Sequence, residues 1–260
     1  MSYQTIITEK KNGYATVKLN RLREMNAICK EMRQELYSAF VELEGDPDVK
    51  AIILTGGEYV FSAGMDIKEM ASLSSEEGDE FLDSMVRYLK TIYSCKKPVI
   101  AAVGGIALGG GFNLVTVCDL VVASESAIFC HPELKFGFNP LFYPLSQIVG
   151  ETKAKEIVML GEPIGANEAL KLGMVNKVAP PEKFMEVARN MAAELATRSS
   201  KALEELKNLC SIVPRMDRIA ALDIEFSVCS LLFARDDRKA QMDNVLLRQK
   251  MRKKISDKKK

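Results

Sequence analysis

The chain has 260 residues, of which 47% are hydrophobic and 27% charged, enough apolar material for one large domain or one domain with an appendage. Lys and Arg number 36 and Asp and Glu 35, so the whole surface has no excess of positive charge that would attract nucleic acid. No apolar run approaches the roughly 20 residues that span a bilayer. The first residues read as a strand and not as a signal peptide, so we expect a cytoplasmic protein without a membrane partner.

Cysteine and histidine are arranged poorly for a metal or redox centre. The six cysteines are scattered without a Cys-x-x-Cys pair, and His131 is the single histidine. We therefore predict no metal site.

Charge is unevenly distributed along the chain. The last twelve residues hold seven of the basic side chains and one acidic one, so a basic tail follows a mildly acidic body.

Strand patterns recur along the first 180 residues. Residues 15–19 alternate apolar and polar side chains, which predicts a half-buried strand. The start of the chain, 1–7, also reads as a strand. Short apolar runs rich in Val, Ile and Ala predict further strands at 49–55, 98–103 and 120–123.

Helical periodicity fills the intervals between these strands. Apolar residues from Ile28 to Leu43 recur at helical spacing, and Gly45-Asp46-Pro47 ends that helix. Ser74 and Glu77 match a capping box, which opens a helix whose apolar face is Phe81, Met85, Leu89 and Ile92. Residues 182–254 show helical periodicity without a strand pattern. The order predicts an α/β core followed by a helical C-terminal section.

Two glycine-containing turns are candidates for ligand contact, at 61–70 and at 104–113. Glycines let backbone N–H groups face a ligand without obstruction by a side chain. The second turn lacks the Lys-Ser/Thr of a P-loop and the Gly-x-Gly-x-x-Gly of a dinucleotide site. Two interpretations remain for it: exposed N–H groups that hold an oxyanion, or a tight turn that allows close packing.

Glu133 is the acidic candidate. It follows Pro132 and precedes a run rich in apolar and aromatic residues, an environment that suits a carboxylate to proton transfer. The alternative is a solvated surface glutamate. Near it, His131 is either a packed, hydrogen-bonded residue or a catalyst, and without a Ser or Cys elbow it supports no hydrolase triad.

Five segments in order resemble the crotonase superfamily, also called the enoyl-CoA hydratase/isomerase family. They are Leu19-Asn20-Arg21 through Met25-Asn26-Ala27, Phe61 to Met70, Ala107 to Gly111 with Cys118-Asp119 behind it, Pro132-Glu133, and Ala166 to Val175. The resemblance covers about residues 5 to 250. It implies an α/β fold, a spiral of ββα turns at 1–195 with the CoA-ester site, and a C-terminal helical trimerisation section with the basic tail at 196–260.

The resemblance also implies a coenzyme A thioester substrate, no separate cofactor, and assembly as a homotrimer or a dimer of trimers, without nucleic acid. The backbone N–H groups of Met65 and Gly110 would hold the thioester oxygen. Glu133 and Asn113 stand where hydratases of the family have two glutamates. The other implied substrate-binding residues are Arg23, Glu24, Met25, Ala63, Asp66, Ile67, Gly109, Phe136, Leu141 and Phe142, with Asp66 more structural than catalytic.

Two departures from the hydratase pattern bear on the reaction. Asn113 can hydrogen-bond water but cannot take its proton. Pro140-Leu141-Phe142-Tyr143-Pro144 replaces the usual Pro-Gly-Ala-Gly-Gly, and a bulky apolar wall excludes water. We therefore predict a Δ3,Δ2-enoyl-CoA isomerase in which Glu133 moves the proton.

Three alternatives stay open. The first is an enoyl-CoA hydratase in which Asn113 places the water, and the second is another reaction on an acyl-CoA enolate. The third, from a different class, is a non-catalytic CoA-ester binder or a protein whose basic tail binds RNA. The sequence leaves the acyl chain undefined.

Overall fold

A computed structural model describes residues 3–235, 238–239, 242–243, 246–247 and 250. The chain divides into two compact units, Met1–Thr197 (unit 1) and Arg198–Lys260 (unit 2). The predicted basic tail, apart from Lys250, lies outside the described residues, as does the end of the helical stretch predicted to reach residue 254. No helix in the described ranges is both long and apolar enough to cross a membrane.

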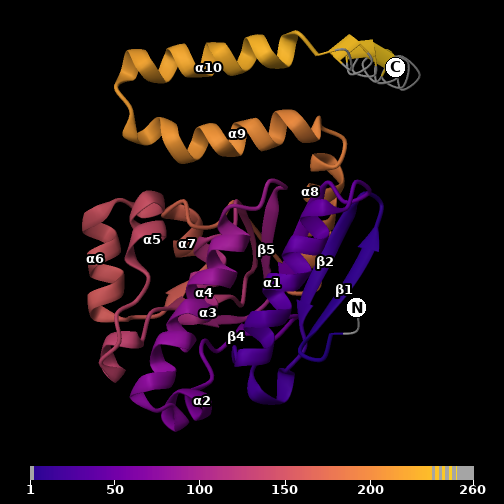
Figure 1. The fold of residues 1–260 in the computed structure, drawn as a ribbon. Helices are drawn as coiled ribbons and strands as arrows, with labels where there is room; N and C mark the ends of the chain where they lie inside the picture. The colour runs from indigo at the N-terminus through magenta and orange to yellow at the C-terminus, as the bar shows by residue number, and fades with distance from the viewer. Residues whose placement is uncertain (1–2, 236–237, 240–241, 244–245, 248–249, 251–260) are drawn as a thin grey trace. The chain divides into compact units, whose positions relative to one another are not determined.

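Unit 1 is built on a six-stranded sheet (Figure 1). Its first two strands pair antiparallel, and all the other neighbours run parallel. In spatial order the strands are β1 (Ile6–Lys11), β2 (Tyr14–Leu19), β3 (Ala51–Thr55), β5 (Val99–Val103), β7 (Leu120–Ser124) and β10 (Lys177–Ala179). The predicted strands at 15–19, 49–55, 98–103 and 120–123 are confirmed within a few residues.

A second sheet arises because β3, β5 and β7 are each followed at once by a short strand that belongs to it. This four-stranded sheet has the order β4 (Val60–Ser62), β6 (Ile106–Leu108), β8 (Ile128–Cys130) and β9 (Ile164–Gly165). Three successive turns of chain therefore contribute one strand to each sheet before a helical segment. The predicted spiral of ββα turns is confirmed.

The helices that alternate with these strands are α1 (Lys30–Gly45), α2 (Ile67–Ser72), α3 (Ser75–Tyr93), α4 (Gly110–Thr116) and α5 (Phe142–Val149). Of these, α1 and α4 contact the sheets, α3 packs on α1, and α2 has no buried residue. The capping box of α3 is present as predicted, with Ser74 and Glu77 bonding to each other's backbone N–H groups. One prediction was wrong in detail: Ile28 precedes α1, because it forms a β-bridge with Met65.

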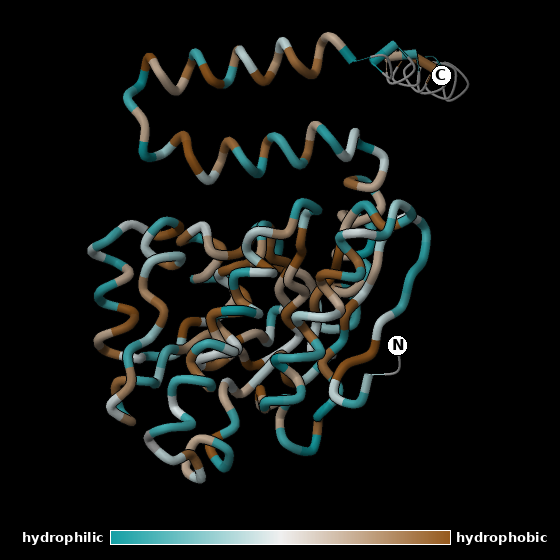
Figure 2. The backbone as a smooth tube through the Cα atoms, in the orientation of Figure 1, coloured by the Kyte–Doolittle hydropathy of each residue, from teal (hydrophilic) through white to brown (hydrophobic). Residues whose placement is uncertain are grey.

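The rest of unit 1 closes the core. It comprises α6 (Glu151–Leu160), α7 (Ala166–Lys171) and α8 (Phe184–Leu195). Apolar residues of α8 bury against the six-stranded sheet beside Ile53 and Ile100. The backbone is hydrophobic along the interior strands and alternates in character along the helices (Figure 2).

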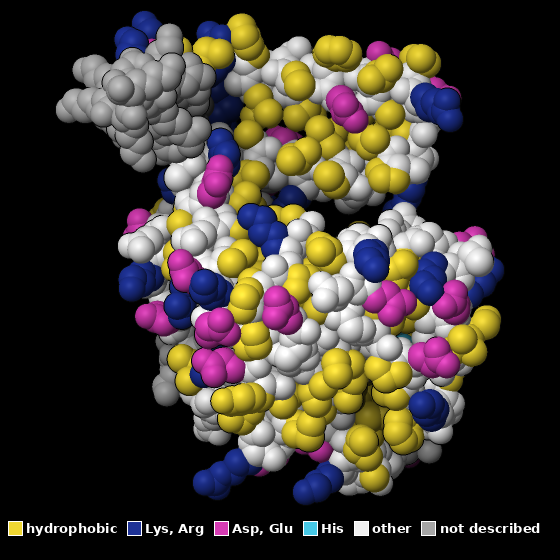
Figure 3. All heavy atoms as spheres, turned by 180° about the vertical axis from the view of Figure 1, so that it is seen from behind, with side chains coloured by type: hydrophobic (Ala, Val, Ile, Leu, Met, Phe, Trp, Pro, Cys, Tyr) yellow, Lys and Arg dark blue, Asp and Glu magenta, His cyan; other side chains and the backbone are white. Residues whose placement is uncertain are grey.

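Unit 2 contains α9 (Ser200–Ile212) and α10 (Arg218–Phe233), joined by a short 3₁₀ turn, Val213–Arg215. Neither helix has a fully buried residue. Large apolar side chains are exposed over both helices (Figure 3), among them Leu206, Ile212, Ile219, Leu222, Phe226, Leu231 and Phe233.

Candidate active site

The first glycine turn follows β4, and backbone hydrogen bonds fix the residues on both sides of Met65. The N–H of Gly64 donates to Ser62 Oγ (3.1 Å), and the N–H of Asp66 donates to the carbonyl of Ile28 (3.2 Å). Gly64 adopts a φ of +98°, which an L side chain would resist. Within the described part of the chain no acceptor is found for the Met65 N–H, so this amide is available to a ligand.

The second glycine turn lies directly against the first. Gly109 has a φ of +48°, and its N–H donates to the carbonyl of Cys130 (2.9 Å). A Cβ added to Gly110 would stand 3.3 Å from the Met65 nitrogen, and one added to Gly64 would stand 3.2 Å from the Gly110 nitrogen. The structure thus brings together the two N–H groups that the sequence singled out.

Glu133 lies beside the same turn. It opens a 3₁₀ segment, Glu133–Phe136, and its side chain is 16% exposed. A Cβ on Gly109 would come within 3.3 Å of its Oε1. The carboxylate therefore borders the backbone of the second turn and is not a fully solvated surface group. Both carboxylate oxygens contact the buried ring of His131, at 3.1 and 3.2 Å from Nδ1.

Asn113 borders an apolar cavity of about 390 Å³. The residue is 5% exposed, and its Oδ1 is buried with no hydrogen-bond partner among the described residues. The remaining lining residues are Leu82, Met85, Val86, Leu89, Lys90, Tyr93, Val117, Asn139, Pro140, Leu141, Tyr143 and Pro144. One turn at the end of α4 contributes Asn113 and Val117 to the wall of the cavity. The two longer parts of the wall come from α3 and from the segment around Pro140.

Not every predicted substrate contact reaches this cavity. Leu141 lines it, whereas Phe142 packs against the core and Phe136 is 63% exposed. The wall supplied by α3 was missed from the sequence. Its signal was present: Leu82 and Val86 are apolar at i, i+4 spacing, off the face that carries Phe81.

The predicted coenzyme A loop is held next to the first glycine turn. Arg23 and Glu24 belong to a 3₁₀ turn, Leu22–Glu24, and the carbonyl of Met25 accepts the N–H of Ala63 (2.9 Å). Met25 itself is in the left-handed region with a φ of 52°. Ile67, on α2, is largely exposed. These residues lie around one turn, and their contact with coenzyme A stays a prediction.

Asn26 and Asp66 hold that loop in place. The buried amide of Asn26 donates to the carbonyls of Gly56, Val60 and Phe61, a role that the sequence did not reveal. Asp66 caps α2 and pairs with Arg21 at 3.0 Å. Burial alone would raise the pKa of Asp66, but the hydrogen bond from Arg21, its positive charge and two backbone N–H groups lower that pKa overall.

A double-sheet spiral of ββα turns, with two backbone amides and one carboxylate at its turns, defines the crotonase class of fold and site. Residues 9–252 match the family model for enoyl-CoA hydratase/isomerase. The protein therefore belongs to the enoyl-CoA hydratase/isomerase family, as its motifs predicted, and is an enzyme of that family, a hydratase or an isomerase.

Individual relatives carry hydratase names. The chain is 35% identical over 254 residues to a crotonyl-CoA hydratase of Syntrophomonas wolfei, covering 96% of this chain and 98% of that protein. It is 36% identical over 247 residues to a mitochondrial enoyl-CoA hydratase of Pongo abelii, covering 93% and 84%. The crystal structure of an enoyl-CoA hydratase from Bacillus anthracis superposes with a TM-score of 0.90 at 28% identity, covering 94% and 97%.

Proposed function

We propose that this enzyme moves the double bond of a 3-enoyl-CoA to the 2-position through a thioester enolate. One observation carries the proposal: Glu133 is the carboxylate beside the paired glycine turns, and the cavity that Asn113 borders is lined by no Asp or Glu among the described residues. A hydratase that binds and activates water with two glutamates would need a second carboxylate at the position of Asn113.

The proton transfer balances with one carboxylate. Glu133 takes a proton from C2, and the electron pair of that C–H bond moves toward the thioester carbonyl to give a dienolate. The N–H groups of Met65 and Gly110 donate to the oxygen that gains the negative charge; losing one such donor typically costs about 3 kcal/mol. The protonated Glu133 then returns the proton to C4, and the double bond settles between C2 and C3.

The hydratase alternative has its own support. The relatives named above carry hydratase names. The buried Oδ1 of Asn113 has no hydrogen-bond partner among the described residues, and a bound water molecule would donate a hydrogen bond to it. In that reaction Asn113 would place the water and Glu133 alone would take its proton.

A paired assay separates the two reactions. Purified protein receives a 3-enoyl-CoA and a 2-enoyl-CoA of equal chain length, and the products are resolved by chromatography. Isomerisation predicts 2-enoyl ester from the first substrate with little hydroxyacyl product from the second. Hydroxyacyl product as the main outcome would make the enzyme a hydratase.

Glu133→Gln tests the base in the same assay. We expect turnover to fall by about 10³-fold or more, because the amide cannot accept the proton, while CoA-ester binding stays nearly unchanged. Glu125→Gln, an exposed glutamate between β7 and β8, is the matched control and should keep full activity. Full activity in Glu133→Gln, or no activity of the native enzyme on either ester, would overturn the proposal.

We also propose that the protein assembles as a homotrimer or a dimer of trimers. Support comes from the exposed apolar residues of α9 and α10, since soluble chains seldom leave large contiguous apolar surfaces uncovered. Light scattering on the purified protein measures the mass directly.

A further inference from the structure

We infer that His131 is a positioning residue for Glu133: its Nδ1–H is shared by both carboxylate oxygens and fixes the base at the glycine turns. The inference rests on the proposed function in one respect, that Glu133 is the base. It adds to that function a residue which does not touch the substrate.

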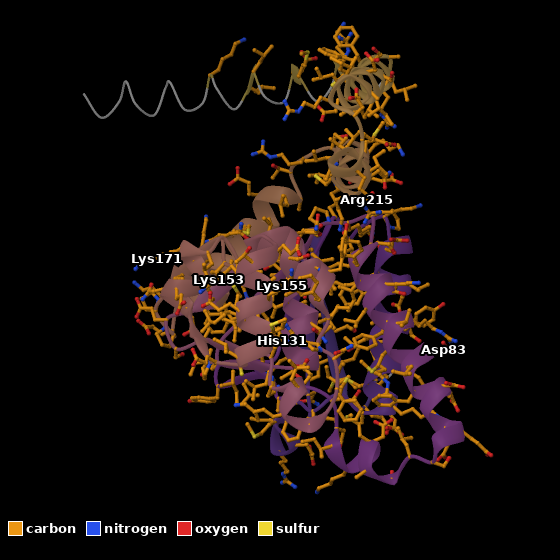
Figure 4. All side chains as sticks on the ribbon, turned by 90° about the vertical axis from the view of Figure 1, so that its left-hand side faces the viewer. Asp83, His131, Lys153, Lys155, Lys171 and Arg215 are labelled. Atoms are coloured by element: carbon orange, nitrogen blue, oxygen red, sulfur yellow. The ribbon has the colours of Figure 1, made fainter. Side chains whose placement is uncertain are left out.

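The contact is symmetric and enclosed. Nδ1 lies 3.1 Å from one carboxylate oxygen of Glu133 and 3.2 Å from the other. The His131 side chain is fully buried, and its ring stacks on Phe112 of α4 at a centroid distance of 4.4 Å. His131 is labelled among the side chains of unit 1 in Figure 4, and the residue is 1% exposed.

The backbone next to His131 is also held by a hydrogen bond. The preceding residue, Cys130, ends β8 and accepts the N–H of Gly109 through its carbonyl (2.9 Å). Gly109 in turn is the residue whose added Cβ would meet the Glu133 carboxylate. Strand, glycine turn, imidazole and carboxylate thus form one closed set of contacts, which limits the positions Glu133 can adopt.

The position of the ring proton follows from its surroundings. Nε2 is buried with no hydrogen-bond partner among the described residues. A tautomer with its only proton on Nε2 would bury an N–H donor without an acceptor, which costs free energy. It would also turn the Nδ1 lone pair toward the carboxylate, and two acceptors repel. The proton that faces Glu133 is therefore on Nδ1.

A shared donor suits a carboxylate that must serve two carbons. In the proposed isomerisation the same group takes a proton at C2 and returns it at C4. A hydrogen bond to one oxygen alone would make the two oxygens unequal and pull one away from the substrate. The nearly equal distances leave both oxygens alike while the N–H holds the carboxylate in place. Displacement of a catalytic group by about 1 Å can cost 10²-fold in rate.

Two substitutions separate this role from packing. His131→Phe keeps an aromatic ring for Phe112 but removes the donor, and we expect kcat to fall by about 10- to 100-fold with KM changed less than about threefold. His131→Asn retains an N–H close to the position of Nδ1, and we expect it to recover most of the lost kcat. Ile53→Val, a buried substitution on β3 in the cluster beneath α8 and outside this set of contacts, should leave kcat unchanged.

Two readouts keep the inference distinct from the proposed function. Each variant is assayed for isomerisation and, by NMR in D₂O, for exchange of the α-protons of a saturated acyl-CoA, which requires the base but no change in the double bond. A native enzyme silent in both assays would overturn the proposed function itself. An active native enzyme with an inactive Glu133→Gln, alongside native kcat in His131→Phe, would overturn only the role of His131.

The Asn variant decides the remaining cases. If both His131 variants are folded by circular dichroism and lose kcat equally, the ring is only structural and the inference fails. If His131→Phe does not fold, kcat of His131→Asn within about fivefold of the native value supports the inference, and loss of activity in the folded His131→Asn overturns it.

Discussion

The two units of the chain use their apolar residues in opposite ways. In unit 1 the apolar residues of strands and helices converge on two buried clusters, one on each face of the six-stranded sheet. In unit 2 the helices α9 and α10 carry large apolar side chains and bury none of them fully. The same residue types are therefore core in one unit and surface in the other.

This difference shows where each unit obtains its stability. A unit with its own core gains free energy of folding from burial within one chain. Helices that expose apolar faces gain that free energy only when another surface covers them. Unit 1 holds all the candidate catalytic groups, so substitutions there should act on folding and activity within one chain, whereas substitutions on α10 should act on assembly.

The largest expected effect is in the core of unit 1. Phe40 on α1 is completely buried, and Phe40→Ala should lower the free energy of unfolding by about 3–5 kcal/mol through lost burial and the cavity left behind. Urea unfolding followed by circular dichroism measures the loss. Val41→Ala on the same helix is 50% exposed and serves as the control, with an expected change within about 0.5 kcal/mol. Equal effects of the two substitutions would contradict the core assignment.

Much of unit 1 was predictable because its signals are local. Local patterns located β2, β3, β5 and β7, and the capping box located the start of α3, since each depends on residues within one element. The strand predicted at 1–7 begins only at Ile6, and the short strands of the second sheet were not predicted. The helix start at Ile28 was misplaced because that residue bonds to Gly64, 36 positions along the chain. Contacts of that kind leave no periodic trace in either segment.

In the candidate site, too, contacts between distant segments could not be predicted from local patterns. Met65, Gly110 and Glu133 were found from motifs, and the fold brings them together. The wall from α3 was not found, because a helix face that lines a cavity has the same composition as one that packs in a core. The His131 contact was also undetermined, since two residues flanking a proline can face together or apart.

A smaller effect is expected from the charged contacts of unit 1. Arg21 and Asp66 pair at 3.0 Å with side chains only 21% and 14% exposed, whereas Lys155 and Glu151 of α6 pair at 2.5 Å with side chains 51% and 70% exposed. Because the pKa of Asp66 is lowered on folding, its ionised form stabilises the native state at pH values above the ordinary pKa of 3.8. That contribution is lost as the pH falls through the lower folded-state pKa.

Asp66→Asn tests this pH dependence. Asparagine still caps α2, so we expect a loss of about 1 kcal/mol at pH 7 from the ionic contact alone, and convergence with the native protein at a pH below the folded-state pKa of Asp66. Urea unfolding between pH 7 and pH 3 gives the difference. Glu151→Gln on α6 is the control, because exposed pairs contribute little and no measurable loss is expected. A constant difference at every pH would contradict the role of charge at Asp66.

The smallest effect on the stability of the single chain is expected on α10. Phe226 is 69% exposed, so Phe226→Ser should change the free energy of unfolding of the dilute chain by less than about 0.5 kcal/mol. Its effect should fall on assembly: removing an apolar ring from the proposed contact surface should shift the mass by light scattering toward the single chain at equal concentration. Ser227→Ala, the exposed neighbour, should leave the mass unchanged. If Phe226→Ser instead destabilised the dilute chain as much as Phe40→Ala, unit 2 would have a core of its own, and its apolar surface would need no partner.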